Sequence, residues 1–297
     1  MQTLGKMSLS LFVWHQLILA YIRYAIIQDL NWTVIFIFLA LTLLVSWFSY
    51  KFIENIKLKK TSSQIIFFSL LITSTALAFA IYRHAGVVRD VPELGITFDH
   101  PYENRNTEYT DQFYNYDKPF ETSKPHVLVI GNSFARDFAA ILKEYDQDNK
   151  YELSYSFDIN ETDDIRISEA DYIFYFGKKS SIPENKLSNI QTDTKIYGIG
   201  TKSFGRNFGI FYAKRNSPEY LTQSIQEYDR CAEINRKWQS EWGKDNFVDL
   251  MNTIKLPNGD IPLFTPWGRV ISFDCRHLTQ DGAKYYAEKI DFNKIFE

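Results

Sequence analysis

The stretch His126-Val-Leu-Val-Ile130-Gly-Asn-Ser133-Phe134 decides the fold of the C-terminal part of the chain. Its first five residues form a short, uninterrupted apolar run rich in β-branched side chains, which is typical of a strand buried on both faces of a parallel sheet. After the Gly-Asn-Ser turn, apolar side chains recur at helical spacing, at Phe134, Phe138, Ile141 and Leu142. The pattern predicts a strand, a tight turn and a helix that packs back onto the sheet.

The rest of the C-terminal part alternates in the same way. Residues 151–157, 171–176 and 195–199 predict further strands, residues 218–239 predict a helix, and a last helix begins near Gln280. This alternation predicts a three-layer α/β/α sandwich with a mainly parallel sheet over residues 126–297. Residues 84–125 mix Pro, Asn, Asp and Tyr without a sustained period and predict a linker.

The charge balance and the cysteine count exclude several classes of protein. The 33 basic and 36 acidic residues give a formal net charge of -3, so the chain has no electrostatic footprint for nucleic acid. It has two cysteines, Cys231 and Cys275, and no paired CxxC or His cluster, so neither a disulfide scaffold nor a structural metal is expected.

Residues 1–83 predict three membrane helices. The runs between Lys6 and Gln28, interrupted by Arg23, from 30 to 50 and from 61 to 82 are apolar and long enough to span a bilayer. The first run has no basic leader or cleavage site, so we expect a retained helix and not a signal peptide. In the first run, His15 is either an intramembrane functional group or a neutral histidine hydrogen-bonded between helices.

The loops predict the orientation of these helices. Four lysines follow the second run, at Lys51, Lys57, Lys59 and Lys60, whereas the connection before it carries only Asp29. Because positive charge marks cytoplasmic loops, the lysine-rich loop is expected in the cytoplasm and everything after Arg83 on the outer side of the membrane.

Ser133 is a candidate nucleophile. It follows a predicted parallel strand and starts a helix, where backbone N–H groups and the helix dipole can stabilise an oxyanion. The alternative is that Ser133 is only the N-cap of that helix, a position that serine favours.

Asp274 and His277 are candidate partners for this serine. They lie three residues apart in Ser272-Phe-Asp-Cys-Arg-His-Leu-Thr279, ahead of a helix that Thr279 can cap. A serine hydroxyl needs a histidine to take its proton and an acid to orient that histidine, and one loop here supplies both groups.

Two resemblances follow from these motifs. Leu4-Gly-Lys-Met-Ser-Leu-Ser-Leu-Phe-Val-Trp-His15 and Ser49-Tyr-Lys-Phe-Ile-Glu54 resemble the closing section of the acyltransferase family 3 membrane domain. Gly131-Asn-Ser133, with Asp274-x-x-His277-Leu-Thr, resembles the first and last sequence blocks of the SGNH hydrolase superfamily, although the first block usually reads Gly-Asp-Ser. SGNH domains recur behind such membrane domains.

The SGNH resemblance implies the roles of the site residues. Ser133 would attack an acyl carbonyl, His277 would take and return its proton, and Asp274 would hold the imidazole tautomer. A glycine after the second strand and an asparagine after the third are expected in the oxyanion hole. Gly177 and Asn207 are the candidates, but both lie in glycine-containing segments that could be ordinary turns.

Cys231 and Cys275 are predicted to form a disulfide, because the domain is expected in an oxidising compartment and the cysteine count is even. The alternative is two free thiols. A bridge would pin the catalytic loop, since Cys275 lies between Asp274 and His277.

The two resemblances together imply acyl transfer, with O-acetylation of a cell-surface glycan such as lipopolysaccharide, capsule or cell-wall polysaccharide. No bound cofactor is expected; the acetyl group would come from acetyl-CoA by way of the membrane domain of a bacterial inner-membrane protein. The first acyltransferase helices are missing from the resemblance, so a separate N-terminal membrane half is an expected partner, beside membrane lipid and the glycan acceptor. The alternatives are a membrane-tethered carbohydrate esterase, which would use water as the acceptor, and a non-catalytic fragment.

Overall fold

The computed structural model describes residues 5–23, 31–54, 61–84, 90–99, 106–158, 165–205, 217–272 and 274–297. The chain divides into two compact units. The first comprises Met1–Asp90, Thr97–Pro101 and Asn207–Tyr220, and the second comprises Val91–Ile96, Tyr102–Arg206 and Leu221–Glu297.

The helices of the first unit are α2 (Ser8–Tyr21), α3 (Trp32–Ser49) with the π-helical turn η2 (Tyr50–Glu54), and α4 (Thr61–Arg83). Among the described residues, two helices are long and apolar enough to cross a membrane, Trp32–Glu54 and Thr61–Arg83, with 23 residues each. At 1.5 Å per residue each is about 35 Å long, which exceeds the roughly 30 Å of a hydrocarbon core.

The prediction of three membrane spans is wrong for the first run. Helix α2 has 14 residues and is therefore about 21 Å long, too short to cross the hydrocarbon core as a straight helix. The prediction counted the apolar residues beyond Arg23 into this span, and residues 24–28 lie outside the described residues.

Helices α2 and α3 meet through small polar side chains. The Ser10 hydroxyl of α2 donates to the Glu54 carboxylate of η2. Ser10, Thr42 and Ser46 are buried between apolar neighbours whose side chains point outward. His15 forms a hydrogen bond through Nδ1 with the carbonyl of Leu11, one turn earlier in the same helix, at 3.0 Å.

The second unit contains the predicted parallel sheet. Its strands run in the order β2-β1-β3-β4-β6, with parallel pairing throughout. The bounds are β1 (His126–Ile130), β2 (Glu152–Ser156), β3 (Tyr172–Phe176), β4 (Lys195–Ile199) and β6 (Phe247–Val248). Four of the five strands fall where the apolar runs predicted them; the two-residue β6 was not predicted.

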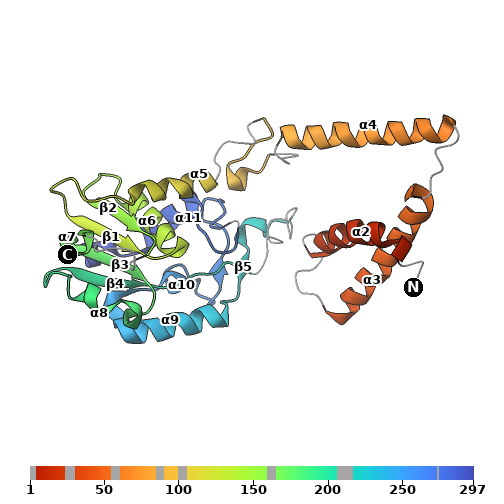
Figure 1. Ribbon diagram of the computed structural model, residues 1–297. Helices are drawn as coiled ribbons and strands as arrows, with labels where there is room; N and C mark the ends of the chain where they lie inside the picture. The colour runs from red at the N-terminus through yellow and green to blue at the C-terminus, as the bar shows by residue number, and fades with distance from the viewer. Residues whose placement is uncertain are drawn as a thin grey trace. The chain divides into compact units, whose positions relative to one another are not determined.

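Helices cover both faces of this sheet, as predicted (Figure 1). On one face lie α6 (Ser133–Tyr145), α11 (Gln280–Lys289) and α12 (Phe292–Phe296), where Phe138 packs on Phe174 with ring centroids 4.9 Å apart. On the other face, α7 (Arg166–Glu169) and α9 (Asp229–Trp242) bury Ile167 and Trp242 against the strands. The structure is therefore an α/β fold with a core on each side of the sheet.

The remaining elements are short. They are η3 (Pro92–Leu94), α5 (Asn106–Asp111), η4 (Gln112–Tyr116), η6 (Lys179–Ser181), α8 (Glu184–Leu187), η8 (Tyr220–Thr222), η9 (Lys244–Asn246), α10 (Leu250–Thr253) and the antiparallel pair β5 (Ser224–Ile225) and β7 (Ile261–Pro262). The predicted helix 218–239 starts too early, because Ser224 and Ile225 pair with β7 before α9 begins at Asp229.

The segment predicted as a linker is partly built into the second unit. Phe113 is fully buried and stacks on Tyr116, and the Ser154 hydroxyl of β2 donates to the Tyr116 carbonyl at 3.0 Å. Aromatic side chains at helical spacing from 109 to 116 thus cover the edge of the sheet, which the polar composition of the segment concealed.

Candidate active site

The turn after β1 fixes Ser133 at the carboxyl edge of the sheet. Gly131 has a φ of +134°, and a Cβ there would lie 2.8 Å from the Phe176 Cβ, so glycine is required. The Asn132 side chain accepts a hydrogen bond from the Phe134 N–H at 3.0 Å and caps α6. Because Asn132 is the N-cap, Ser133 is the first residue of the helix, and its hydroxyl is not needed for capping.

The loop before α11 holds Asp274 firmly. One oxygen of its carboxylate, Oδ1, accepts the backbone N–H groups of Arg276 at 2.9 Å and His277 at 2.6 Å. The other oxygen, Oδ2, is hydrogen-bonded to Nδ1 of the His277 ring. The carboxylate therefore sets both the loop and the imidazole.

The third contact brings the predicted nucleophile to this pair. Nε2 of His277 lies 2.8 Å from the Ser133 hydroxyl oxygen, across 144 residues of sequence. If Nδ1 carries the hydrogen that is donated to Asp274, Nε2 is the acceptor for the serine hydroxyl. The structure thus brings Asp274, His277 and Ser133 together in one hydrogen-bonded row, in the arrangement that lets a histidine remove a serine proton.

The environment of Asp274 keeps it ionised. Burial favours the neutral acid, but the hydrogen bonds from the His277 ring and from the N–H groups of His277 and Arg276 outweigh it. They hold the pKa of Asp274 well below its usual value. A carboxylate beside Nδ1 stabilises the imidazolium that forms when His277 takes a proton.

Helix α11 anchors the loop at its other end. The Thr279 hydroxyl accepts the Gly282 N–H at 2.9 Å as the predicted helix cap, and the Thr279 N–H donates to the Ile271 carbonyl at 3.0 Å. The position of His277 is therefore tied to the start of α11. Phe273 in this loop lies outside the described residues.

A buried ion pair beneath the site was missed by the sequence analysis. Asp137 lies one helical turn after Ser133, and its Oδ2 is 2.6 Å from Nζ of Lys202, with both side chains at most 1% exposed. The same oxygen accepts the N–H of Leu278, the residue after His277, at 3.0 Å. Burial lowers the pKa of Lys202, although Asp137 beside it acts in the opposite direction.

This pair joins the elements that carry the site. Asp137 belongs to α6, Leu278 to the histidine loop, and Lys202 to the segment after β4; the Lys202 ammonium also lies 4.3 Å from the centroid of the Phe134 ring. One sequence signal could have revealed it: Asp137 is a charged residue next to Phe138 on the otherwise apolar side of α6.

Of the two oxyanion-hole candidates, the structure describes Gly177 but not Asn207. Gly177 follows β3 directly and lies at the same sheet edge as the Ser133 turn, because Ile130 is paired with Tyr175. Its φ is +147°, and its carbonyl accepts the Trp242 indole N–H at 2.8 Å. Its role as an oxyanion donor stays a prediction. Asn207 lies outside the described residues.

The predicted disulfide is absent: Cys231 and Cys275 are not joined by an S–S bond. The two thiols turn to different surroundings. Cys231, on α9, has the Thr201 side chain as its hydrogen-bond partner, whereas Cys275 is buried in the loop with Gly205 beside its sulfur. Cys275 also has a φ of +63°, a left-handed conformation that directs its side chain into the protein. The bridge was thus a wrong inference from the even count.

No three His, Cys, Asp or Glu side chains within the described ranges are grouped so that they could hold a metal ion.

Comparisons with protein-family models and with curated proteins gave no match. Among solved structures, the chain is similar to the periplasmic domain of a lipopolysaccharide acetyltransferase from Salmonella ser. Paratyphi A. The identity is 14% and the TM-score 0.43, and the similarity covers 66% of this chain and 98% of that one. The geometry of the site, and not this similarity, supports the proposal that follows.

Proposed function

We propose that this chain is an O-acyltransferase of the SGNH type, which acetylates a hydroxyl group of a cell-surface glycan such as lipopolysaccharide, capsule or cell-wall polysaccharide. The observation that carries the proposal is the row of hydrogen bonds from Asp274 through His277 to Ser133, at the carboxyl edge of a parallel sheet. Ligand and catalytic sites of α/β proteins form at this edge.

In the proposed reaction, His277 takes the proton of Ser133 while the serine oxygen forms a bond to the acyl carbonyl carbon. His277 then gives that proton to the leaving group as the bond to it breaks, which leaves an acyl-serine. An acceptor hydroxyl attacks next, its proton passes to His277, and Ser133 regains a proton when the ester bond to it breaks. The N–H groups at the start of α6, with Gly177 and Asn207 as further candidates, would stabilise the oxyanion.

The membrane part suits this proposal through the two apolar helices and the Ser10–Glu54 contact between its acyltransferase-like motifs. We propose that it anchors the chain in a bacterial inner membrane with the second unit on the outer side. Acetyl groups from acetyl-CoA would reach Ser133 by way of the membrane part, with or without a further membrane polypeptide.

One observation favours hydrolysis as a second candidate. The side chains of His277 and Asp274 are 26% and 29% exposed, so water has access to the base. A membrane-tethered carbohydrate esterase would use the same row of residues and the same acyl-serine, with water in place of the sugar hydroxyl.

The test is turnover of 4-nitrophenyl acetate by the full chain in detergent, with and without purified surface glycan. We expect Ser133→Ala to reduce the rate by about 10⁴-fold or more, because removal of the nucleophile leaves only the residual contribution of the site. Ser168→Ala, on the other face of the sheet, is the matched control and is expected to retain the wild-type rate.

The products separate the candidates. Acetyl esters on the glycan, detected by NMR, support the transferase, and release of acetate alone supports the esterase. Wild-type rates in folded Ser133→Ala, or no turnover by the wild-type chain, would contradict both.

A further inference from the structure

A small pocket lies at the end of α6 that is remote from Ser133. It has a volume of about 190 Å³, is partly open to solvent and is lined by the last turns of α6, the loop that follows, the start of β2 and the segment before β1. Lys143, on its wall, is ten residues after Ser133 in the same helix, which corresponds to about 15 Å along the axis. The pocket is therefore separate from the candidate active site.

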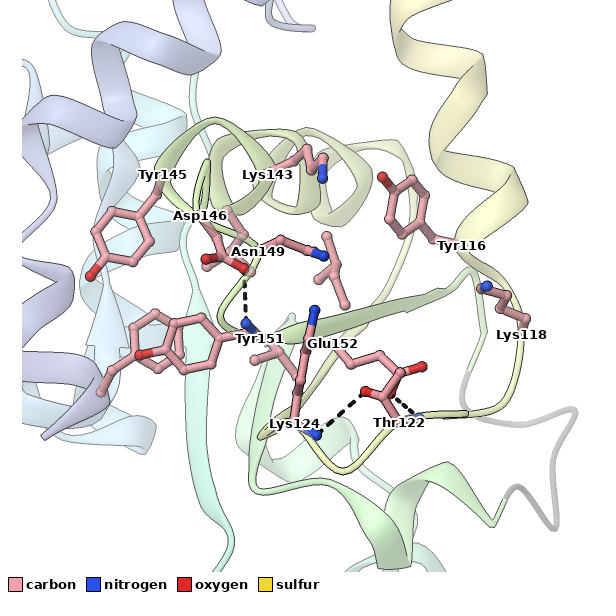
Figure 2. A pocket seen from close by; sticks show the side chains of 14 residues that line it. Tyr116, Lys118, Thr122, Lys124, Lys143, Tyr145, Asp146, Asn149, Tyr151 and Glu152 are labelled. Carbon is pink, nitrogen blue, oxygen red and sulfur yellow. Dashed lines mark hydrogen bonds between the residues drawn. The ribbon is translucent and has the colours of Figure 1, made fainter.

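Basic and amide side chains point into this pocket from three segments. Figure 2 shows the ends of Lys124, Lys143 and Asn149 directed at the same hollow. Lys143 also complements the C-terminus of α6, as basic residues in a last helical turn do. Lys124 comes from the segment before β1 and Asn149 from the loop after α6, so the helix terminus does not account for their presence.

The acidic groups of the wall are already engaged by the protein. Glu152 accepts the N–H groups of Glu121 and Thr122 at 2.7 and 2.8 Å and the Thr122 hydroxyl at 2.6 Å. Burial acts to raise the pKa of Glu152, but these hydrogen bonds hold it below its usual value. Asp146 accepts the N–H groups of Lys150 and Tyr151 at 2.7 and 2.9 Å.

The lysines of the pocket differ in whether an acidic side chain pairs with them. Neither Lys124 nor Lys143 forms an ion pair with another described residue, whereas Lys118 at the rim is 3.7 Å from the Glu121 carboxylate. Two cationic donors and an amide thus remain for a ligand, over a floor formed by Val127, Leu142 and Leu153. This combination fits a compact molecule with an anionic group, hydroxyl groups and an apolar face.

We propose that the pocket binds an acidic sugar unit, with its carboxylate or phosphate on Lys124 and Lys143, its hydroxyls near Asn149 and its C–H face on the apolar floor. The proposal rests on the proposed function, because it makes this unit part of the glycan acceptor at a subsite away from Ser133. The volume is below the roughly 300–1,000 Å³ of clefts for drug-sized ligands, as a site for one sugar unit requires. An anionic membrane surface is the competing partner, and the apolar residues that line the pocket beside the two lysines favour the sugar.

The test measures binding by the full chain in detergent, using isothermal titration calorimetry. The probes are an oligogalacturonate and a phosphorylated maltooligosaccharide, each compared with its uncharged counterpart, the methyl ester and the unphosphorylated oligosaccharide. We expect a charged probe to bind at least tenfold more tightly than its counterpart. The Lys124→Gln/Lys143→Gln variant is expected to lose about ten- to a hundredfold in affinity, as hydrogen bonds to charged groups predict.

Lys150→Gln is the matched control, because it removes a lysine close in sequence whose ammonium lies 3.3 Å from Asp148 and outside the pocket. It is expected to bind as the wild type does. Equal binding of charged and uncharged probes, wild-type affinity of the double variant, or a preference for anionic vesicles that the double variant abolishes would overturn the proposal.

Calorimetry needs no turnover, so the two proposals fail separately. Binding is therefore also measured with Ser133→Ala. If the chain hydrolyses the ester but does not bind the probes, the pocket proposal alone is wrong. If the chain binds the probes but its Ser133→Ala variant still hydrolyses the ester, the proposed function alone is wrong.

Discussion

Replacing Lys202 by methionine is expected to destabilise the second unit strongly. The substitution keeps an unbranched side chain but leaves the Asp137 carboxylate, 1% exposed, without its counter-charge. Removal of one partner from a buried ion pair costs about 3–5 kcal/mol. Since one kcal/mol shifts the melting temperature of a 150–250-residue domain by about 2–4 °C, Tm should fall by roughly 6–20 °C.

A double variant separates stability from positioning. In Lys202→Met/Asp137→Leu both charges of the pair are removed, and apolar replacement of a buried ion pair is often neutral or stabilising. The Leu278 N–H then loses its acceptor, which costs about 1–3 kcal/mol. The double variant should therefore melt above Lys202→Met, while its kcat for the chromogenic ester stays low and its KM changes little, because α6 and the histidine loop are no longer joined.

Thermal unfolding of the full chain in detergent, followed by near-UV circular dichroism, measures the melting temperatures, and turnover of the chromogenic ester measures kcat and KM. Lys150→Gln, whose ion pair with Asp148 is exposed, is the control and should not shift Tm measurably. A Tm for Lys202→Met within a few degrees of wild type would refute the penalty for the buried charge. Wild-type kcat in a folded double variant would show that the pair does not position His277.

Two further predictions concern the histidine loop. Asp274→Asn should lower stability near neutral pH, with a deficit relative to wild type that shrinks as the pH falls below about 4. The folded-state pKa of Asp274 is depressed, so its contribution is present above the unfolded pKa and is lost on acidification; a deficit unchanged down to pH 3 would contradict this. Mass spectrometry should find no disulfide between Cys231 and Cys275. Burial raises the pKa of Cys275 to about 11, so its alkylation at pH 8 should be slow until the protein is unfolded; a linked peptide pair would contradict the structure.

The sheet was predictable because each central strand is a continuous apolar run. Strands buried on both faces have few polar positions, so His126–Ile130 and Lys195–Ile199 are visible without any tertiary information. The two-residue β6 was not, since Phe247 and Val248 become a strand only through pairing with Gly198 and Ile199. The start of α9 was misplaced for a similar reason, because the pairing of β5 with β7 is non-local.

The row of site residues was predictable because its members lie in two short motifs. Asp274 and His277 are three residues apart, and Ser133 follows a strand that could be recognised. The sequence marks Asp137 as a charge beside the apolar Phe138 of α6, but it does not identify Lys202 as the partner. The two residues are 65 positions apart, and only the packing of α6 beside the segment after β4 buries them together. The disulfide prediction was wrong because tertiary packing also decides where each thiol points, and the cysteine count carries no information on that.

The hydrogen bonds of the row assign its members distinct roles. Asp274 uses one oxygen for two backbone N–H groups and the other for His277, so the carboxylate cannot rotate without losing a contact. With Nδ1 committed to Asp274, only Nε2 of His277 faces Ser133. Any proton that His277 accepts at Nε2 therefore comes from the Ser133 hydroxyl or from a molecule bound beside the Ser133 oxygen after that oxygen has lost its proton. That is the geometry required of an acceptor alcohol in the second half of an acyl transfer, and the same geometry serves water in hydrolysis. In the proposed reaction, what reaches Nε2 makes the choice between the two, so the residues that bind the acceptor, and not the row itself, would decide whether the acyl group is transferred or hydrolysed.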